Sequence, residues 1–123
     1  MDDVNPGKSS EELTIELIDS PSGARIMKLH GALTLKTLFD FQLVSRQQAS
    51  HPIVVDLSAV PYMDSAGLGS LISIFASCQR TGRGFAMTGI SDRLRTLLEV
   101  THCDGLLPCF DTLDAAETAV AKS

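Results

Sequence analysis

Aromatic and basic residues are sparse in this 123-residue chain, which has no tryptophan, one tyrosine and only 10 lysines and arginines. The basic residues are scattered, and the formal net charge is −5. Proteins that bind nucleic acids neutralise phosphates with a clustered basic face and stack exposed bases on aromatic side chains. The composition therefore predicts that nucleic acid is not a partner.

Long apolar runs are also missing. No stretch approaches the roughly 18 consecutive apolar residues that a bilayer-spanning helix requires. The first residues, Met1 to Pro6, show no basic segment leading into an apolar one, which is the pattern of a secretory signal. We therefore expect no secretory signal, no direct insertion into a membrane and a cytoplasmic location.

Cysteine is present only at Cys78, Cys103 and Cys109, at wide and irregular spacing. The odd number and the lack of a Cys-x-x-Cys pair argue against a disulfide framework and against a zinc site. Gly67 and Gly69 do not indicate a nucleotide loop, because the segment lacks the P-loop lysine and the spacing of the dinucleotide-binding fingerprint. The sequence predicts no bound metal and no cofactor.

Strand-like and helix-like segments alternate along residues 12–121. Alternating or β-branched runs predict strands at 13–17, 24–29, 53–55, 85–88 and 106–110, with a turn at 19–23. Helices are expected at about 35–48, from residue 65 to about 80, after a cap at Ser91, and after a cap at Asp111 or Thr112. This order predicts an α/β domain whose mixed sheet has four to five strands, an N-terminal hairpin, a mostly parallel core and about four helices. Residues 1–11 are expected to form a flexible arm.

Two of the expected helices have assigned apolar positions. In the segment at 65–80, a single apolar face follows the spacing i, i+3, i+4 and i+7. In the segment at 35–48 the period is imperfect. The assigned positions are Leu68, Leu71, Ile72 and Phe75 in the former, and Leu35, Leu38, Phe39 and Leu43 in the latter.

The segment from Tyr62 to Gly69 lies between a strand and the helix with the clearest pattern, where α/β proteins tend to place function. Asp64 is a natural N-cap, which puts Ser65 at the first position of the helix. The free N–H groups and the positive dipole there would partly accommodate a phosphate on Ser65. The same phosphate adds about −1.5 to −2 charges beside Asp64, so it would disrupt a docked interface.

Small residues are concentrated in this helix. Gly67 and Gly69 each cost about 1 kcal/mol relative to alanine, which suggests that another backbone approaches closely. Away from the apolar face, uncharged small residues follow the spacing i, i+4, i+7 and i+11, and they predict a surface that lies against another protein. These residues are Ala66, Ser70, Ser73 and Ser77. An ordinary cap, with small residues that pack inside the same domain, is the alternative.

Three segments of the chain resemble the STAS domain family. The run Val54-Val55-Asp56-Leu57-Ser58 followed by Met63-Asp64-Ser65-Ala66-Gly67-Leu68-Gly69 resembles the family's strand and its Asp-Ser-Ser/Ala-Gly-Leu/Ile-Gly motif. Gly31-Ala32-Leu33 is similar to the family's Gly-x-Leu, and residues 104–116 resemble its last strand and helix. The resemblance spans about residues 12–120. It implies a STAS-type fold.

The resemblance also implies a function, that of an anti-sigma-factor antagonist without enzymatic activity. In that group, the serine after the motif's aspartate is phosphorylated by a partner that is both an anti-sigma factor and a serine kinase. The unphosphorylated antagonist binds this partner, and a PP2C-like phosphatase resets the system. The matching residue is Ser65, with no competing serine at Ala66. Thr34 stands where the family commonly has an aspartate near the phosphoacceptor, which suggests a different partner. The expected partner-binding residues are Thr34, Asp64, Ser65, Ala66, Gly67, Gly69, Ser70, Ser73 and Ser77.

Two alternatives stay open. Ser65 could be a catalytic nucleophile with His30, His51 or His102 as its base, although Met63 breaks the Gly-x-Ser-x-Gly pattern of a nucleophile elbow. The chain could instead be a constitutive interaction module without phosphorylation. In that case it would serve as a stressosome scaffold component or as an accessory subunit of a lipid or anion transporter.

Overall fold

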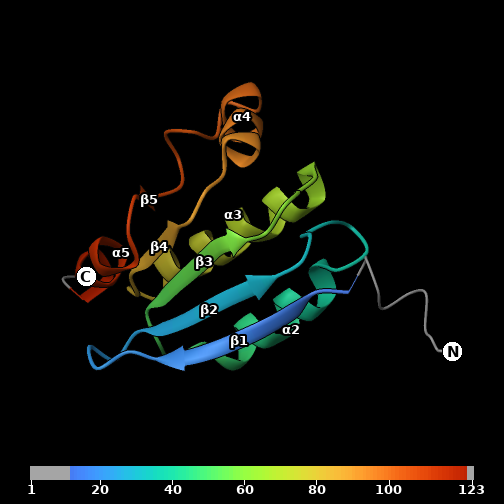
Figure 1. Cartoon of the computed structure of the whole chain (residues 1–123). Coiled ribbons are helices and arrows are strands. Elements are labelled where there is room, and N and C mark those ends of the chain that lie inside the picture. Colours follow the sequence, from blue (N-terminus) through green and yellow to red (C-terminus); the bar gives the residue numbers. More distant parts are fainter. Residues whose placement is uncertain (1–11, 122–123) are drawn as a thin grey trace, which may run out of the picture.

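A five-stranded sheet organises the computed structural model, which describes residues 12–121. The expected arm at 1–11 lies outside the described residues. The strands follow one another across the sheet in sequence order (Figure 1). They are β1 (Thr14–Asp19), β2 (Arg25–His30), β3 (Ile53–Ala59), β4 (Phe85–Thr88) and β5 (Cys109–Phe110). Strands β1 and β2 form an antiparallel hairpin, and all later neighbours are parallel, which confirms the predicted mixed sheet.

The part of the chain between residues 12 and 121 has four helices: α2 (Leu38–Gln47), α3 (Ser65–Arg80), α4 (Asp92–Val100) and α5 (Leu113–Ala121). Helices α2 and α3 lie behind the sheet in Figure 1, and α5 lies on its other face. The larger core is on the α2–α3 side, and full burial of each large side chain there contributes about 1.5–3 kcal/mol. It contains Leu29, Phe41, Val55, Leu71 and Met87; the smaller core under α5 contains Ile26, Val54, Ala86, Ala116 and Val120.

Three helices begin at polar caps that the sequence contains. The Gly67 amide donates to the Asp64 carboxylate, and the Leu94 amide donates to the Ser91 hydroxyl at 3.2 Å. Both caps confirm the prediction. Of the two candidate caps before α5, Thr112 accepts the hydrogen bond, from the Ala115 amide at 3.1 Å. Each such cap stabilises its helix by about 1 kcal/mol because it pairs an otherwise unsatisfied N–H group.

The first helix begins later than predicted. Residues 34–37 form a turn instead, in which the Thr37 and Leu38 amides both donate to the Thr34 carbonyl. The preceding Leu33 is held by backbone hydrogen bonds to the chain at 62–64. These bonds hold residues 33–37 in an extended segment and a turn, and α2 starts only at Leu38.

Most of the apolar positions named for this first helix are exposed to solvent. Leu38 is buried, but Leu35, Phe39 and Leu43 are 62%, 67% and 56% exposed. The residue that fills the core is Phe41, which is 0% exposed. Positions three and four apart share a helix face equally well, so two apolar stripes compete in this sequence. Only contact with the sheet decides which one is buried.

Strands β1 and β2 lie within two residues of the expected bounds, whereas β3 and β5 differ by three residues or more. The last strand is limited to Cys109–Phe110, because Pro108 has no N–H group and pairs only through its carbonyl, which accepts from Met87 at 2.8 Å. Strand β3 runs on to Ala59, four residues beyond the buried run at 53–55. Its extension carries the chain toward the Asp64–Ser65 segment.

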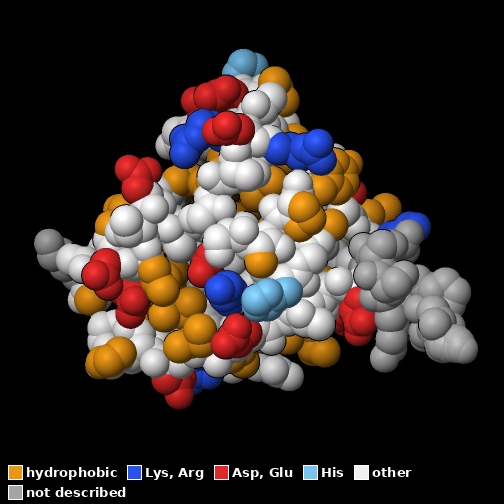
Figure 2. All heavy atoms as spheres, in the orientation of Figure 1, with side chains coloured by type: hydrophobic (Ala, Val, Ile, Leu, Met, Phe, Trp, Pro, Cys, Tyr) orange, Lys and Arg blue, Asp and Glu red, His pale blue; other side chains and the backbone are white. Residues whose placement is uncertain are grey.

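Charged side chains of both signs are dispersed over the face of the molecule drawn in Figure 2, and they form no continuous basic patch there. None of the helices between residues 12 and 121 combines the length and apolarity that a bilayer crossing requires.

Candidate functional site

Two loops meet at the carboxyl ends of β2 and β3. Leu33 and Met63 pair as an isolated parallel bridge that continues the contact between these strands. The Leu33 amide donates to the Tyr62 carbonyl at 3.1 Å, and the Asp64 amide donates to the Leu33 carbonyl at 3.3 Å. The loop that carries Thr34 and Leu35 is therefore held beside the start of α3.

Asp64 joins the two loops through its side chain. One carboxylate oxygen, Oδ1, accepts from the Gly67 amide at 2.8 Å and caps α3. The other oxygen, Oδ2, accepts from the Leu35 amide at 3.1 Å. The sequence predicts only the cap. The second bond shows that Asp64 also positions the loop before α2.

Ser65 is the first residue of α3, as predicted, and its side chain is exposed. Among residues 12–121, no side-chain or backbone group forms a hydrogen bond with its hydroxyl. The hydroxyl lies at the positive end of the helix dipole, next to N–H groups that lack intrahelical acceptors. A second protein can reach Ser65 without rearranging the domain.

The two glycines of this first turn have opposite surroundings. A Cβ on Gly67 would lie 2.1 Å from the Leu33 carbonyl oxygen, so the domain's own backbone explains this glycine. A Cβ on Gly69 would have nothing within 4 Å, and Gly69 is exposed. The close approach predicted for both glycines is observed within the domain only at Gly67.

The predicted surface of small residues is only partly exposed. Ser70 is 2% exposed, and its hydroxyl donates to the Gly67 carbonyl at 2.6 Å, so its assignment to an exposed docking surface is wrong. Ala66 and Ser77 are half-buried, and Ser73 is exposed. The error has a geometric cause. The buried side of α3 includes Leu71, Ile74 and Cys78, and with 3.6 residues per turn position 70 lies close to it.

The solvent-facing side of α3 is uncharged over its first three turns. It follows the spacing i, i+4, i+8 and i+11 from Ser65, through Gly69 and Ser73, to the half-buried Ala76, with the half-buried Ile72 beside them. A solvated helix face normally carries charged side chains. This set, Ser65, Gly69, Ile72, Ser73 and Ala76, is called here the outer face of α3.

An exposed apolar stripe begins beside Asp64 and was not identified from the sequence as a surface feature. It consists of Leu35, Phe39 and Leu43, and Tyr62, in the adjoining loop, is also 46% exposed. Leu35 is directly bonded to Asp64 through its amide. The signal in the sequence is the i, i+4, i+8 spacing, which does not by itself say whether the stripe faces the core or the solvent.

Thr34 occupies the loop beside Asp64. Its amide donates to the Thr37 hydroxyl at 2.9 Å, and its own hydroxyl accepts from the Lys36 amide at 3.3 Å. The half-buried Thr34 side chain therefore adds no charge to the surroundings of Ser65.

The three histidines make their contacts away from Ser65. His30 pairs with Glu16, His51 contacts Arg25 and the Gly23 carbonyl, and His102 is exposed in the turn after α4. None of them hydrogen-bonds to the Ser65 hydroxyl, so the alternative that Ser65 is a catalytic nucleophile with a histidine base has no geometric support. Within the described residues, no three His, Cys, Asp or Glu side chains gather as metal ligands would.

Burial raises the pKa of the Cys78 thiol, an effect that the nearby Arg83 partly opposes. Burial likewise raises the pKa of the Cys109 thiol, against a smaller opposing effect of Arg95. Both thiols therefore favour the protonated form, which is the less nucleophilic one. All three cysteines are free.

Known proteins of similar sequence and structure were found for this chain. The STAS domain model matches residues 15–116. Anti-sigma-B factor antagonists of Staphylococcus epidermidis and Staphylococcus aureus are 29% and 31% identical to it over 84 residues, covering 66% of this chain and 78% of each relative. The crystal structure of an anti-sigma factor antagonist from Mycobacterium paratuberculosis matches with a TM-score of 0.78 and 28% identity, over 88% of this chain and 93% of that one.

These matches agree with the motif at residues 63–69 and with the order of strands and helices. The family model covers most of the described domain, and it includes both loops that meet at Asp64. The chain therefore belongs to the STAS domain family, and its relatives in that family include anti-sigma-factor antagonists.

Proposed function

We propose that this protein is an anti-sigma-factor antagonist that acts by partner switching in the cytoplasm. With Ser65 unmodified, it binds an anti-sigma factor that is also a serine kinase, and the sigma factor is released. Phosphorylation of Ser65 ends this binding, and a PP2C-like phosphatase restores it. The protein itself is a regulator and supplies no catalytic group, so transcription is affected only indirectly.

The observation that carries this proposal is the exposed, unengaged hydroxyl of Ser65 at the start of an uncharged helix face. The outer face of α3 begins at Ser65, and Leu35, the first of the exposed apolar residues Leu35, Phe39 and Leu43, is bonded to Asp64 through its amide. Exposed apolar patches bordered by polar groups are typical of protein–protein contacts. An uncharged surface of this kind can be covered by a partner at low desolvation cost.

Phosphorylation changes this surface through charge. In the kinase-bound state the Ser65 oxygen would attack the terminal phosphorus of ATP, lose its proton and leave ADP as the second product. The product carries about −1.5 to −2 charges next to the Asp64 carboxylate. The helix N-terminus stabilises a phosphate in water, but burying two adjacent anions against a partner is unfavourable. The phosphorylated protein should therefore fold normally and bind weakly.

Binding measurements with charge variants of the full chain test this mechanism. Ser65→Asp should lower the affinity for the anti-sigma factor of the same organism by at least tenfold, and Ser65→Ala should keep it. Ser50→Asp is the matched control, because Ser50 is an exposed serine in the turn before β3 and lies at the opposite end of that strand. Equal affinities of Ser65→Asp and the control would contradict the switch and favour a constitutive interaction module.

Mass spectrometry of the protein from its own cells tests the modification itself. A single phosphate that maps to Ser65, with an occupancy that changes between growth conditions, is the expected result. An unmodified Ser65 under all growth conditions would contradict the proposal even if the chain binds an anti-sigma factor.

A further inference from the structure

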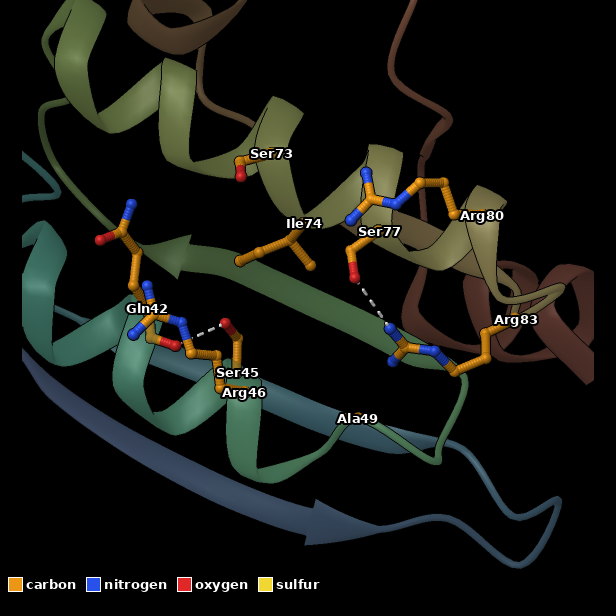
Figure 3. A pocket seen from close by; sticks show the side chains of 9 residues that line it. All are labelled: Gln42, Ser45, Arg46, Ala49, Ser73, Ile74, Ser77, Arg80 and Arg83. Carbon is orange, nitrogen blue, oxygen red and sulfur yellow. Dashed lines mark hydrogen bonds between the residues drawn. The ribbon is translucent and has the colours of Figure 1, made fainter.

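A cavity of about 250 Å³ lies between α2 and the second half of α3, and Ser73 is the one residue that it shares with the outer face of α3. Figure 3 shows that its side chains come from both helices and from the loop after α3. We call it the arginine groove; its lining residues are Gln42, Ser45, Arg46, Ala49, Ser73, Ile74, Ser77, Arg80 and Arg83. Ser73 lies eight residues after Ser65, which is about 12 Å along the helix axis.

The groove concentrates positive charge in an acidic protein. It contains three of the chain's six arginines, although the formal net charge of the whole chain is −5. None of its lining residues is an aspartate or a glutamate. Three guanidinium groups in one hollow repel one another, and a bound anion would remove that repulsion.

Arg83 is held in place by the domain. Its Nη1 donates to the His51 and Gln48 carbonyls at 3.0 and 3.3 Å. Its Nε donates to the Thr81 hydroxyl at 2.7 Å, and its Nη2 donates to the Ser77 hydroxyl at 3.3 Å. The positive charge of Arg83 therefore stands at the wall of the groove before any ligand arrives.

Arg46 and Arg80 are exposed, and within residues 12–121 neither side chain has a hydrogen-bond or ion-pair partner. Figure 3 shows Arg80 and Arg83 both extending toward Ser77, with Arg46 on the facing helix α2. The guanidinium groups of Arg46 and Arg80 are thus available to a ligand, and that of Arg83 is already positioned. Guanidinium groups bind phosphate oxygens in pairs of parallel hydrogen bonds.

We propose that the arginine groove binds a phosphate group, either as free phosphate or as a small phosphate ester. Besides the guanidinium groups, the lining offers the hydroxyl of Ser73 and the amide of Gln42 as donors. The lining includes no aromatic side chain, so it offers no surface on which a nucleotide base could stack. The size and polarity suit a compact anion.

The groove is open to solvent, so binding should weaken as salt screens the arginines. Nuclear magnetic resonance of the ¹⁵N-labelled full chain tests this with sodium phosphate, glycerol 3-phosphate and sodium chloride at equal ionic strength. We expect phosphate to shift the amide signals of Ser73, Ser77 and Arg80 in a saturable way. Tighter binding of the ester than of phosphate would assign the site to a phosphate ester, and equal or weaker binding would assign it to free phosphate.

Charge-removing variants locate the site. Arg46→Gln and Arg80→Gln should each raise the phosphate Kd at least fivefold. Both side chains are exposed and unpaired, so the variants should fold, as a urea unfolding curve checks. Arg93→Gln is the matched control, because Arg93 is an exposed arginine on α4 outside the groove, and its Kd should stay within twofold of the original.

Three results would overturn the proposal. The first is a chloride titration that shifts the same signals as far as phosphate does. The second is an Arg93→Gln variant that loses as much affinity as Arg80→Gln. The third is an acidic peptide that shifts the groove signals at lower concentration than either phosphate compound, which would make the groove a protein-docking site.

Discussion

The two glycines in the first turn of α3 offer a paired test of how this site is built. Gly67→Ala and Gly69→Ala introduce the same methyl group two residues apart in one helix. Each substitution removes the propensity cost of glycine and should contribute about 1 kcal/mol in favour of folding if nothing else changes. The structure predicts that this gain is realised at Gly69 alone.

At Gly67 the new methyl carbon would lie 2.1 Å from the Leu33 carbonyl oxygen and 2.8 Å from the Leu33 carbonyl carbon. Both atoms are backbone, so the loop must move by about an ångström to restore an ordinary contact. That movement strains the bonds that the Asp64 amide and carboxylate make to Leu33 and Leu35. Overpacking costs about 1–3 kcal/mol and each lost hydrogen bond about 1 kcal/mol. After the helix gain, we expect a net loss of about 2–4 kcal/mol.

Urea unfolding of both variants, followed by circular dichroism, measures the difference. With a slope of about 2 kcal/mol/M, Gly67→Ala should lower the midpoint by about 1–2 M, whereas Gly69→Ala should raise it by a few tenths of a molar. Midpoints that shift in the same direction would refute the packing argument. The partner assay adds a second readout, since an alanine at Gly69 on the outer face of α3 should weaken anti-sigma-factor binding although the fold is stabilised.

Three further predictions concern the cap of α3, the orientation of α2 and the accessibility of the cysteines. Asp64→Ala should cost about 1–2 kcal/mol in urea unfolding, whereas Asp64→Asn should keep most of the cap; equal losses would contradict the capping role. Phe41→Ala should cost about 3–5 kcal/mol, and Phe39→Ala on the same helix should change the unfolding free energy by less than about 0.5 kcal/mol; comparable losses would invalidate the assigned orientation of α2. Iodoacetamide should label native Cys103 well before Cys78, because burial excludes the reagent and raises the pKa of the Cys78 thiol; mass spectrometry that finds Cys78 labelled first would reject this.

The motif around Ser65 could be interpreted correctly from the sequence because its structure is local. An aspartate cap acts on an amide three residues away, so Asp64 and the start of α3 follow from adjacent residues alone. Strand β4 was predicted with its observed bounds, since Phe85 to Thr88 lie between a glycine-containing turn and Gly89. The parallel core follows from the alternation of strands and helices.

The helix before β3 could not be interpreted in the same way. Leu35, Phe39 and Leu43 form one apolar stripe, and Leu38 and Phe41 belong to another. Periodicity identifies each stripe but does not say which one faces the sheet. The start of this helix depends on Leu33 pairing with the chain at 62–64, about 30 residues away, and no local signal reports that contact.

The surface of α3 also has features that the sequence predicts and features that only the structure shows. The sequence showed that small residues are frequent in this helix, but it could not distinguish Ser70, which is buried and bonded to Gly67, from Ser73, which is exposed. It likewise could not assign a close contact to Gly67 and open space to Gly69. Both distinctions depend on how the loop at 33–35 lies across the start of the helix.

The sequence by itself determined the α/β class, the hairpin, the capped helix that presents Ser65 and the family resemblance, because these depend on residues within a few positions of one another. Only the tertiary structure decided which apolar stripe of α2 is exposed, which small residues of α3 remain accessible and that Arg46, Arg80 and Arg83 share one groove. The loop contact and the groove each join segments about 30 residues apart in the chain. Their physical cause is the packing of two helices on one face of a sheet, which brings together side chains that local periodicity cannot relate.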